Sequence, residues 1–456
     1  MNRILMLTLL CAGLAVESSG VAQTGNPPAR FRLLTLDPGH FHAALVQKFM
    51  HDDVDPRVTV YSPGGDDLQE HLARIERFNT RTNLPTHWRE QVYTGPDFLE
   101  KMLTEKRGNV VVIAGNNARK TDFILKCVQG GLNVLADKPM AITPADLPKL
   151  REAFAVAASN HVLLYDIMTE RFEITTALQD EFSRQPAVFG ELVKGSAEDP
   201  AIVMESVHYF SKIVAGAPLK RPAWAFDVRQ EGEGIVDVST HLVDLAQEAA
   251  FPAQALQPGE TTVLRARRWA TPITLPQFQK VTGLPDFPGF LGEDVKNGVL
   301  QVFGNGEFTW RLRDVFARVS VAWGFEPPPG GGDSLHSVLR GTRSRLVIRQ
   351  GVEQAFKPVL YVEKTGDLDA GVFAASLQSA VNALQSKYPG VSWQKESGSI
   401  WRIIIPEKYD VGHEAHFSQV TENYLGYLRA GRLPDWEVPC MITKYATIMQ
   451  AYEMSR

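Results

Sequence analysis

The sequence is short of cysteine, of clustered basic residues and of long apolar runs. Its 456 residues include only three cysteines, Cys11, Cys127 and Cys440, which are too few for a disulfide framework. The formal net charge is -5, and no cluster of Lys and Arg gives the footprint of a nucleic-acid partner. No apolar run is long enough to span a bilayer. We therefore expect neither a nucleic-acid-binding protein nor a membrane-spanning one.

What is present is the composition of a globular protein. Hydrophobic residues make up 44% of the chain and charged residues 22%, which are ordinary proportions. A chain of 456 residues is too long for one ordinary hydrophobic core. We expect two domains.

The first residues have the pattern of a targeting signal. Arg3 supplies a positive charge, an apolar segment follows from Ile4 to Val16, and Gly20-Val21-Ala22 offers small residues for cleavage. We expect residues 1–22 to be a signal peptide and the protein to be exported to a periplasm or outside the cell. Cys127 and Cys440 would then meet an oxidising compartment, where one disulfide is an alternative. We favour two separate buried thiols.

Strands and helices alternate from residue 31 to residue 165. The apolar runs predict strands that are parallel and joined by crossover helices. Thr143 and Pro144 read as the N-cap and first turn of one helix. The predicted strands are 31–36, 58–61, 109–114, 132–136 and 161–165, and the predicted helices are 43–50, 68–78, 121–130 and one starting after Thr143.

The first predicted strand ends in a turn that suits a phosphate group. The turn is Asp37-Pro38-Gly39-His40-Phe41-His42, and only Gly39 stands where a dinucleotide-binding turn has three glycines. Ser62 ends the second strand, and Asp66 and Asp67 follow it; an acid there would favour NAD over NADP, and a solvated loop is the alternative. His40 and His42 have no further ligand at a metal-binding spacing. We expect no metal.

Two later strands also end in polar turns. Gly115-Asn116-Asn117 follows one, and Asp137-Lys138-Pro139 follows the next. A doubly wound sheet places its chemistry at such strand ends.

The second half reads as a mostly antiparallel sheet. Gly304-Asn305-Gly306 predicts a hairpin between two of its strands. The open face of this sheet would pack on a second subunit, so we predict a homo-oligomer. His413 and His416 share a helical face and read as substrate contacts or as structural residues. The predicted strands are 261–269, 299–303, 307–314, 315–323, 346–348, 359–362 and 401–405, and the helices are 371–388 and 413–429.

These patterns resemble the glucose-fructose oxidoreductase / inositol dehydrogenase / MocA (Gfo/Idh/MocA) family. Asp137-Lys138-Pro139 resembles its Glu-Lys-Pro turn, with Asp in place of Glu, and Asn117 lies 21 residues before Lys138 as in the family. The segment from Gly232 to Asp244 holds the second hallmark: a glycine turn, then Asp237, His241 and Asp244. The resemblance covers the first half well, and the rest is similar to a secreted, sugar-associated branch with a divergent C-terminal domain.

The resemblance implies an α/β fold in two parts. A Rossmann domain with a parallel sheet would occupy residues 30–166. A substrate-binding and oligomerisation domain with a large open, mostly antiparallel sheet would occupy residues 167–456.

The resemblance also assigns roles to residues. His241 would be the general base and Lys138 would stabilise the alkoxide, with Asp237 orienting His241 or binding a sugar hydroxyl. Arg171 reads either as a substrate contact or as a domain-crossing salt bridge, and Trp224 either as a platform for a sugar ring or as core. The substrate-binding candidates are Lys138, Glu170, Arg171, His208, Trp224, Asp237 and His241. The cofactor-binding candidates are Asp37, Gly39, His40, Phe41, His42, Ser62, Asp66, Asn116, Asn117, Asp137 and Lys138.

The resulting hypothesis is an exported NAD(H)-dependent oxidoreductase. It would oxidise or reduce a secondary hydroxyl of a sugar or glycoside, with C3 as a candidate position. NAD is preferred over NADP and is expected to stay tightly bound, because free NAD is scarce outside the cytoplasm. Two alternatives remain: an NAD-dependent glycoside hydrolase that uses transient oxidation and elimination, and a non-catalytic carbohydrate-binding protein on the same fold.

Overall fold

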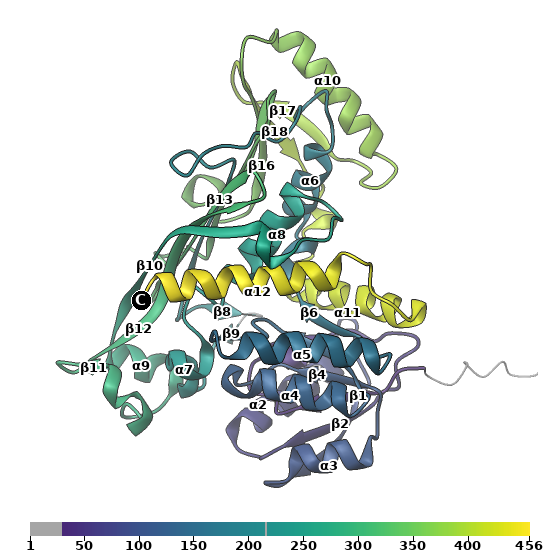
Figure 1. The fold of residues 1–456 in the computed structure, drawn as a ribbon, viewed down its shortest axis with the longest axis vertical. Helices are drawn as coiled ribbons and strands as arrows, with labels where there is room; N and C mark the ends of the chain where they lie inside the picture. The colour runs from purple at the N-terminus through teal and green to yellow at the C-terminus, as the bar shows by residue number, and fades with distance from the viewer. Residues whose placement is uncertain (1–29, 215–216) are drawn as a thin grey trace, which may run out of the picture.

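The computed structural model describes residues 30–214 and 217–456; the predicted signal peptide, residues 1–22, lies outside them. Figure 1 shows a smaller α/β domain below a large, curved sheet. The last helix, α12 (Glu437–Met454), runs along the junction and packs on α5 (Asp146–Ser159), α8 (Ser239–Ala250) and β10 (Thr261–Thr274). One hydrophobic core extends from the smaller domain into the larger one.

The smaller domain is built on six parallel strands. Their order is β3-β2-β1-β4-β5-β6, so the predicted Rossmann-type fold is confirmed. The sequence did not predict β3, because this strand at the edge of the sheet is mostly exposed and polar. The strands in sheet order are β3 (Arg89–Thr94), β2 (Arg57–Ser62), β1 (Leu33–Leu36), β4 (Val110–Ile113), β5 (Asn133–Asp137) and β6 (Leu164–Ile167).

The helices of this domain differ from prediction at their N-terminal ends. The predicted cap at Thr143 is wrong: α5 begins at Asp146, whose carboxylate accepts hydrogen bonds from the Thr143 backbone N–H (3.0 Å) and hydroxyl (2.8 Å). The helix after Gly39 has only four residues. The helices before α5 are α1 (His42–Leu45), α2 (Asp66–Thr80), α3 (Phe98–Glu105) and α4 (Asn117–Gln129).

The larger domain is built on a ten-stranded sheet. All of its strand pairs are antiparallel except β13 with β7, which confirms the predicted mostly antiparallel sheet. Strands β7, β14 and β17 were not predicted from the sequence. The strands in sheet order are β10, β12 (Val299–Leu312), β13 (Val315–Gly324), β7 (Ile202–Tyr209), β14 (Ser334–Arg340), β15 (Ser344–Gln350), β16 (Val359–Lys364), β18 (Ile400–Ile404) and β17 (Ser392–Lys395), with β11 (Val295–Lys296) beside β12.

The predicted hairpin at Gly304-Asn305-Gly306 is wrong, because β12 continues through these residues. Asn305 is buried and its side-chain amide donates to the Trp269 carbonyl oxygen (2.9 Å). Gly306 on β12 and Gly234 on the segment that crosses it have no room for a side chain. A Cβ on Gly306 would lie 2.4 Å from Ile235, and one on Gly234 would lie 1.6 Å from the Gly304 carbonyl oxygen. The glycines therefore seat the turn that carries Asp237 against the sheet.

Helices cover one side of the large sheet and its ends (Figure 1). Cys127 and Cys440 are buried, free thiols, as predicted. The remaining elements include η1 (Thr169–Phe172), α6 (Ile174–Ser183), β8 (Ile213–Val214), β9 (Ala217–Pro218), η2 (Ala223–Phe226), α7 (Val228–Glu231), η3 (Pro258–Glu260), α9 (Leu275–Thr282), η4 (Gly289–Asp294), η5 (Val352–Gln354), α10 (Ala370–Leu384), η6 (Glu407–Tyr409) and α11 (His413–Ala430).

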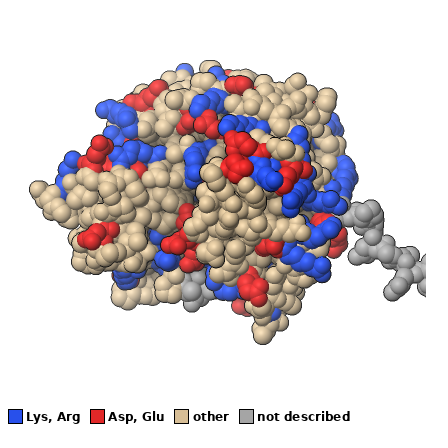
Figure 2. All heavy atoms as spheres, turned by 90° about the horizontal axis from the view of Figure 1, so that it is seen from below, with Lys and Arg blue, Asp and Glu red and all other residues tan. Residues whose placement is uncertain are grey.

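Two features bear on partners. Across residues 30–214 and 217–456, the structure has no helix with the length and apolarity that a membrane crossing requires. On the face seen from below in Figure 2, basic and acidic side chains are interspersed.

Candidate active site

The candidate active site lies at the carboxyl ends of β1, β4 and β5. Gly115, after β4, has no room for a side chain, because a Cβ there would lie 2.1 Å from the Asp37 carbonyl oxygen. The Gly39 backbone N–H donates to the Ala114 carbonyl oxygen (3.2 Å), which joins the turns that follow β1 and β4. The residue after β5 is Lys138. Three strand ends thus meet at one edge, as a Rossmann-type sheet requires.

Lys138 and Asp237 form the central ion pair. Lys138 Nζ lies 2.6 Å from Asp237 Oδ1, and the side chains are only 11% and 10% exposed. Asp237 sits in the turn before α8, which begins at Ser239. Burial lowers the pKa of Lys138, but Asp237 and Asp137 outweigh burial and raise it above its ordinary value. Lys138 is therefore an ammonium group and a hydrogen-bond donor.

His241 lies in the first turn of α8 and is buried. Its Nδ1 has no hydrogen-bond partner among the described residues. Burial, followed by the charge of Lys138, lowers its pKa to about 4. His241 is therefore neutral near pH 7 and can accept a proton, although it holds that proton weakly.

Two histidines and the acid before Lys138 form a second cluster. His42 Nδ1 lies 2.9 Å from Asp137 Oδ2, and His40 Nδ1 lies 3.6 Å from the same oxygen. Burial lowers the pKa of both histidines well below the ordinary value. Phe41 lies between them in the chain, and its ring packs against both imidazoles.

Lys120 and Glu231 complete the charged surroundings, and the sequence predicted neither. Buried Lys120 donates from Nζ to the Asp137 carbonyl oxygen (3.0 Å), and burial lowers its pKa to about 8. Burial and the charge of Asp237 raise the pKa of Glu231 to about 8. Lys120 is on α4 and Glu231 ends α7; no local sequence signal marks either, because their environment is built by segments far apart in the chain.

A segment of the larger domain, residues 222–231, covers the turn that follows β1. Trp224 Nε1 donates to Asp67 Oδ2 (2.9 Å), and the indole lies 3.2 Å from where a Cβ on Gly39 would be. Asn116 Nδ2 donates to Gln230 Oε1 (2.7 Å), and Asn117 Nδ2 donates to the Glu231 carbonyl oxygen (2.7 Å). Trp224, a candidate for substrate contact, thus packs beside Gly39 and Asp67, where the candidate cofactor-binding turn lies.

The edge of the sheet fits a nicotinamide dinucleotide. Gly39 leaves the turn without a side chain, and Asp67, at the start of α2, has a carboxylate suited to ribose hydroxyls. The predicted acid Asp66 is exposed, whereas Asp67 points towards Gly39 and Trp224. Ser62 serves the turn itself: its Oγ accepts from the Gly64 backbone N–H (3.1 Å). Asp37, also predicted to bind cofactor, pairs with Arg119 (2.7 Å).

Arg171 belongs to a buried ion network. Its guanidinium forms two hydrogen bonds with the Asp244 carboxylate (2.6 and 2.8 Å) and one with Glu437 (3.0 Å). Lys444 lies 2.8 Å from both Asp244 and Asp166. These contacts favour the salt-bridge interpretation of Arg171 over substrate binding.

Glu170, beside Arg171, faces the catalytic side. Its carboxylate lies 3.5 Å from His413 Nδ1. Burial alone would raise the pKa of Glu170, but His413, His241 and His416 lower it to about 2. His413 is half exposed and its ring lies 6.3 Å from that of His42, so α11 contributes to the same site.

His208 lies at the end of β7 among other polar groups. Its Nδ1 lies 3.1 Å from Asp333, and Lys212 Nζ lies 2.6 Å from the same carboxylate. Its ring packs against Trp323, as does the Arg221 guanidinium. The structure gives no contact between His208 and Lys138 or Asp237.

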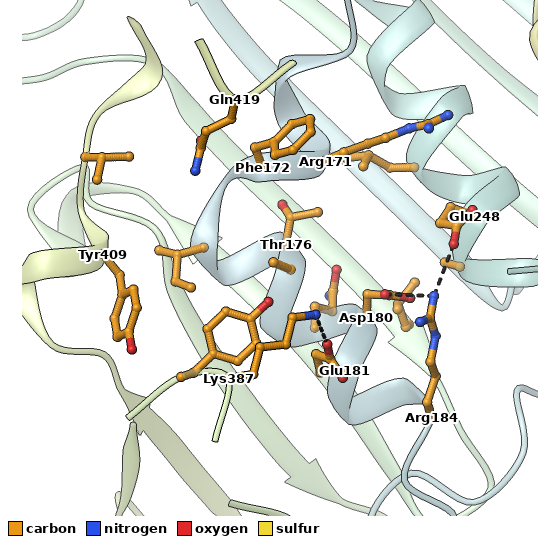
Figure 3. Close-up of a pocket in the computed structure, with 18 of the residues that line it drawn as sticks. Arg171, Phe172, Thr176, Asp180, Glu181, Arg184, Glu248, Lys387, Tyr409 and Gln419 are labelled. Atoms are coloured by element: carbon orange, nitrogen blue, oxygen red, sulfur yellow. Dashed lines mark hydrogen bonds and ion pairs between the residues drawn. The ribbon is translucent and has the colours of Figure 1, made fainter. Parts of the chain in front are cut away.

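A cavity of about 610 Å³ lies behind η1, lined by α6, the end of α8 and the segment around Tyr409. Figure 3 shows Arg184 between Asp180 and Glu248, and Lys387 reaching Glu181. Arg171 lines this cavity, whereas Lys138, Asp237 and His241 do not. The cavity is therefore separate from the candidate catalytic groups.

Comparisons with known proteins agree with this geometry. The family model "Oxidoreductase family, NAD-binding Rossmann fold" matches residues 68–165, and "Putative oxidoreductase C terminal domain" matches residues 178–456. A crystal structure of a "putative oxidoreductase" from Parabacteroides merdae is 51% identical, with a TM-score of 0.92, and the match covers 94% of this chain and 98% of that one. A search of curated proteins found no match.

More distant structures share the fold alone. A levoglucosan dehydrogenase in complex with NADH and levoglucosan is 12% identical, with a TM-score of 0.57 over 93% of this chain and 97% of that one. A 3-ketoreductase from Actinomadura kijaniata in complex with NADP and TDP-benzene is 13% identical, with a TM-score of 0.53 over 92% of this chain and 96% of that one.

Proposed function

Because the chain belongs to the Gfo/Idh/MocA oxidoreductase family, with its NAD-binding Rossmann fold and the associated oxidoreductase C-terminal domain, we propose that it is a sugar or glycoside dehydrogenase. The reaction is hydride transfer at a secondary hydroxyl, with C3 as the candidate position. The observation that carries this proposal is the Lys138–Asp237 pair at 2.6 Å, beside neutral His241 at the carboxyl edge of the parallel sheet. The levoglucosan dehydrogenase of the same fold, solved with levoglucosan, supports the substrate class.

Lys138, Asp237 and His241 have different roles in removing the hydroxyl proton. The Lys138 ammonium donates a hydrogen bond to the substrate oxygen and stabilises it as it becomes an alkoxide. Asp237 holds Lys138 charged and in place. His241 is neutral and accepts the hydroxyl proton through its free ring nitrogen. A bound nicotinamide supplies the hydride acceptor.

The cofactor is proposed to be NAD and to stay bound between turnovers. Asp67 next to Gly39 would repel the 2′-phosphate of NADP. Residues 222–231 contact Asp67, Asn116 and Asn117 through Trp224, Gln230 and Glu231, and so cover the proposed cofactor position. A cofactor beneath this segment leaves only after these contacts break, which suits an exported enzyme whose bound NADH is re-oxidised in place by a second carbonyl substrate.

Denaturing the purified protein tests the cofactor proposal. We expect NAD in the supernatant, identified by mass spectrometry, and saturable NAD binding by protein from which the nucleotide has been removed. Protein that contains no nucleotide and shows no saturable NAD binding would contradict the proposal.

An NAD-dependent glycoside hydrolase is the second candidate. Elimination from an oxidised sugar needs acid and base groups beyond those for hydride transfer, and Glu170 with His413 supplies such a pair near His241. Product analysis separates the two: free aglycone without a keto sugar indicates the hydrolase, and a keto glycoside indicates the dehydrogenase.

Export and self-association complete the proposal. Residues 1–22 would direct the chain to the periplasm or outside, and periplasmic fractionation with detection of the cleaved N-terminus tests this. The face of the large sheet that carries Val203, Phe316 and Val338 is only partly covered and would pack on a second copy. Light scattering should then give a multiple of the monomer mass, and Phe316→Glu should reduce it to the monomer.

A further inference from the structure

The cluster at His40, His42 and Asp137 places three ligand-type groups around one point. One ring nitrogen from each histidine and one carboxylate oxygen all lie within 4.8 Å of one another. The sequence offered only the two histidines. Asp137 follows 95 positions after His42 and comes within 2.9 Å of it, because β1 and β5 both pair with β4 in the parallel sheet.

The separations suit a common ion. Two ligand atoms at about 2.1 Å from a tetrahedral ion lie about 3.4 Å apart. The Asp137 oxygen lies 2.9 Å from His42 Nδ1 and 3.6 Å from His40 Nδ1, on either side of this value. The two histidine nitrogens lie within 4.8 Å of each other, so the side chains would move to bring all three atoms to bonding distance.

His42 Nδ1 and Asp137 Oδ2 contact each other, but two other polar atoms of the cluster have no partner among the described residues. The Asp137 side chain is only 4% exposed, yet its Oδ1 has no hydrogen-bond partner among the described residues. His40 Nδ1 is also buried without one. Unsatisfied buried groups are costly. An ion bound at Asp137 Oδ2 would give His40 Nδ1 a partner, and would reach Oδ1 as well only if the carboxylate bound it with both oxygens.

The nearby lysines do not occupy the cluster. Lys138 Nζ is held by Asp237, and Lys120 Nζ donates to the Asp137 backbone carbonyl oxygen, not to its carboxylate. Their charges oppose a cation and would weaken its binding, but neither ammonium group contacts the Asp137 carboxylate, whose Oδ2 is contacted by His42 Nδ1.

We propose that His40, His42 and Asp137 form a site for a divalent transition-metal ion such as Zn²⁺. Two imidazoles and one carboxylate are the ligand set of open zinc sites, in which a fourth position remains for a water molecule or a reactant oxygen. The ion would place positive charge in a turn that has one glycine where a dinucleotide-binding turn usually has three. It would also stand beside Lys138, next to the proposed reaction.

The test uses the full mature chain without a polyhistidine tag. The protein is stripped with a chelator, incubated with Zn²⁺ alone and freed of excess metal, and zinc is measured by mass spectrometry. We expect one equivalent in the wild type and at least about tenfold less in His40→Gln and in Asp137→Asn. His336→Gln removes an exposed histidine on β14 and should keep the full equivalent.

Two further readouts make the result decisive. Co²⁺ in place of Zn²⁺ should give visible d–d absorption in the wild type and none in His40→Gln. Zn²⁺ should raise the melting temperature of the wild type and of His336→Gln only. The proposal is overturned if the stripped wild type binds no zinc and shows no cobalt band, or if folded His40→Gln binds as much zinc as the wild type. If both site variants unfold, the wild-type stoichiometry and cobalt band decide.

Discussion

At the scale of single residues, the charge of Lys138 depends on its partner. Asp237 holds the ammonium in place, and both groups are almost fully buried. Lys138→Ala removes the donor and leaves the Asp237 carboxylate buried and unpaired, so we expect both chemistry and stability to suffer.

We predict that Lys138→Ala lowers kcat/KM for sugar-dependent reduction of NAD by about 10²–10³-fold, the usual cost of losing a donor to a developing oxyanion. Nicotinamide absorbance at 340 nm gives the rate, and bound nucleotide is measured separately. Lys149→Ala removes an exposed lysine paired with Asp122 and should leave the rate unchanged. An unchanged rate in Lys138→Ala would refute the catalytic assignment.

A second residue-scale prediction concerns pH and stability. Glu90, on β3, accepts a hydrogen bond from Gln47 (2.7 Å), and burial raises the pKa of Glu90 from 4.5 to about 7. The folded protein therefore keeps a proton that the unfolded chain releases. The stability from the neutral carboxyl is complete below pH 4.5 and is lost as the pH rises through about 7.

We expect Glu90→Gln, which cannot ionise, to be more stable than the wild type at pH 8 by roughly 1–3 kcal/mol, and equal to it near pH 4. Urea unfolding at both values measures this difference. Exposed Glu76→Gln is the control, and its stability should follow the wild type at each pH. An equal difference in stability between Glu90→Gln and the wild type at both pH values would refute the prediction.

At the scale of elements, β12 positions the turn that carries Asp237. Because Gly306 has no side chain, residues 234–236 can pack closely on the strand. The Gly234 N–H donates to the Phe303 carbonyl oxygen (2.9 Å). Asp237 comes directly after this contact. The ion pair with Lys138 thus depends on a strand that provides no catalytic side chain.

Gly306→Ala should therefore lower both stability and activity. The new methyl group would lie 2.4 Å from Ile235. Because such overpacking forces backbone shifts, we predict a loss of about 1–3 kcal/mol, measured by urea unfolding, together with a fall in kcat. Gly289→Ala places its methyl group in open space and should match the wild type in both measurements. A Gly306→Ala variant with normal kcat would show that β12 does not set the position of Asp237.

The elements also show where sequence reasoning stops. Parallel strands were predictable because their apolar runs are buried on both faces, as in β4 with Val110 to Ile113. Residues 304–306 were wrongly predicted to be a hairpin turn, because glycines are typical both of hairpin turns and of strands that pack closely against another segment. Strand β3 was missed, because an exposed edge leaves no apolar pattern. Lys138, Asp237 and His241 were identified from the resemblance; Lys120 and Glu231 were not, because only the fold buries them.

At the scale of the whole molecule, the network around Arg171 ties the two domains together. Arg171 pairs with Asp244 on α8 and Glu437 on α12, and Lys444 on α12 links Asp244 to Asp166 on β6 of the smaller domain. Removing one member of a buried ion network leaves the other charged groups without partners.

We predict that Arg171→Met costs about 3–5 kcal/mol of stability, measured by urea unfolding, because Asp244 and Glu437 lose their hydrogen bonds. KM for the sugar should change little in the folded fraction. Arg184→Met breaks a more exposed pair with Asp180 and should cost under about 1 kcal/mol. A large rise in KM with unchanged stability would instead support substrate binding by Arg171.

The last helix has a consequence for how the protein is made. The Tyr445 hydroxyl accepts a hydrogen bond from the Met140 backbone N–H (3.0 Å), two residues after Lys138, across 305 positions of chain. A ribosome produces the parallel sheet long before it produces α12. The strand end that presents Lys138 therefore lacks this contact on one side until α12 has been synthesised. A nascent chain should remain without activity until α12 docks, even though its first domain could already have collapsed.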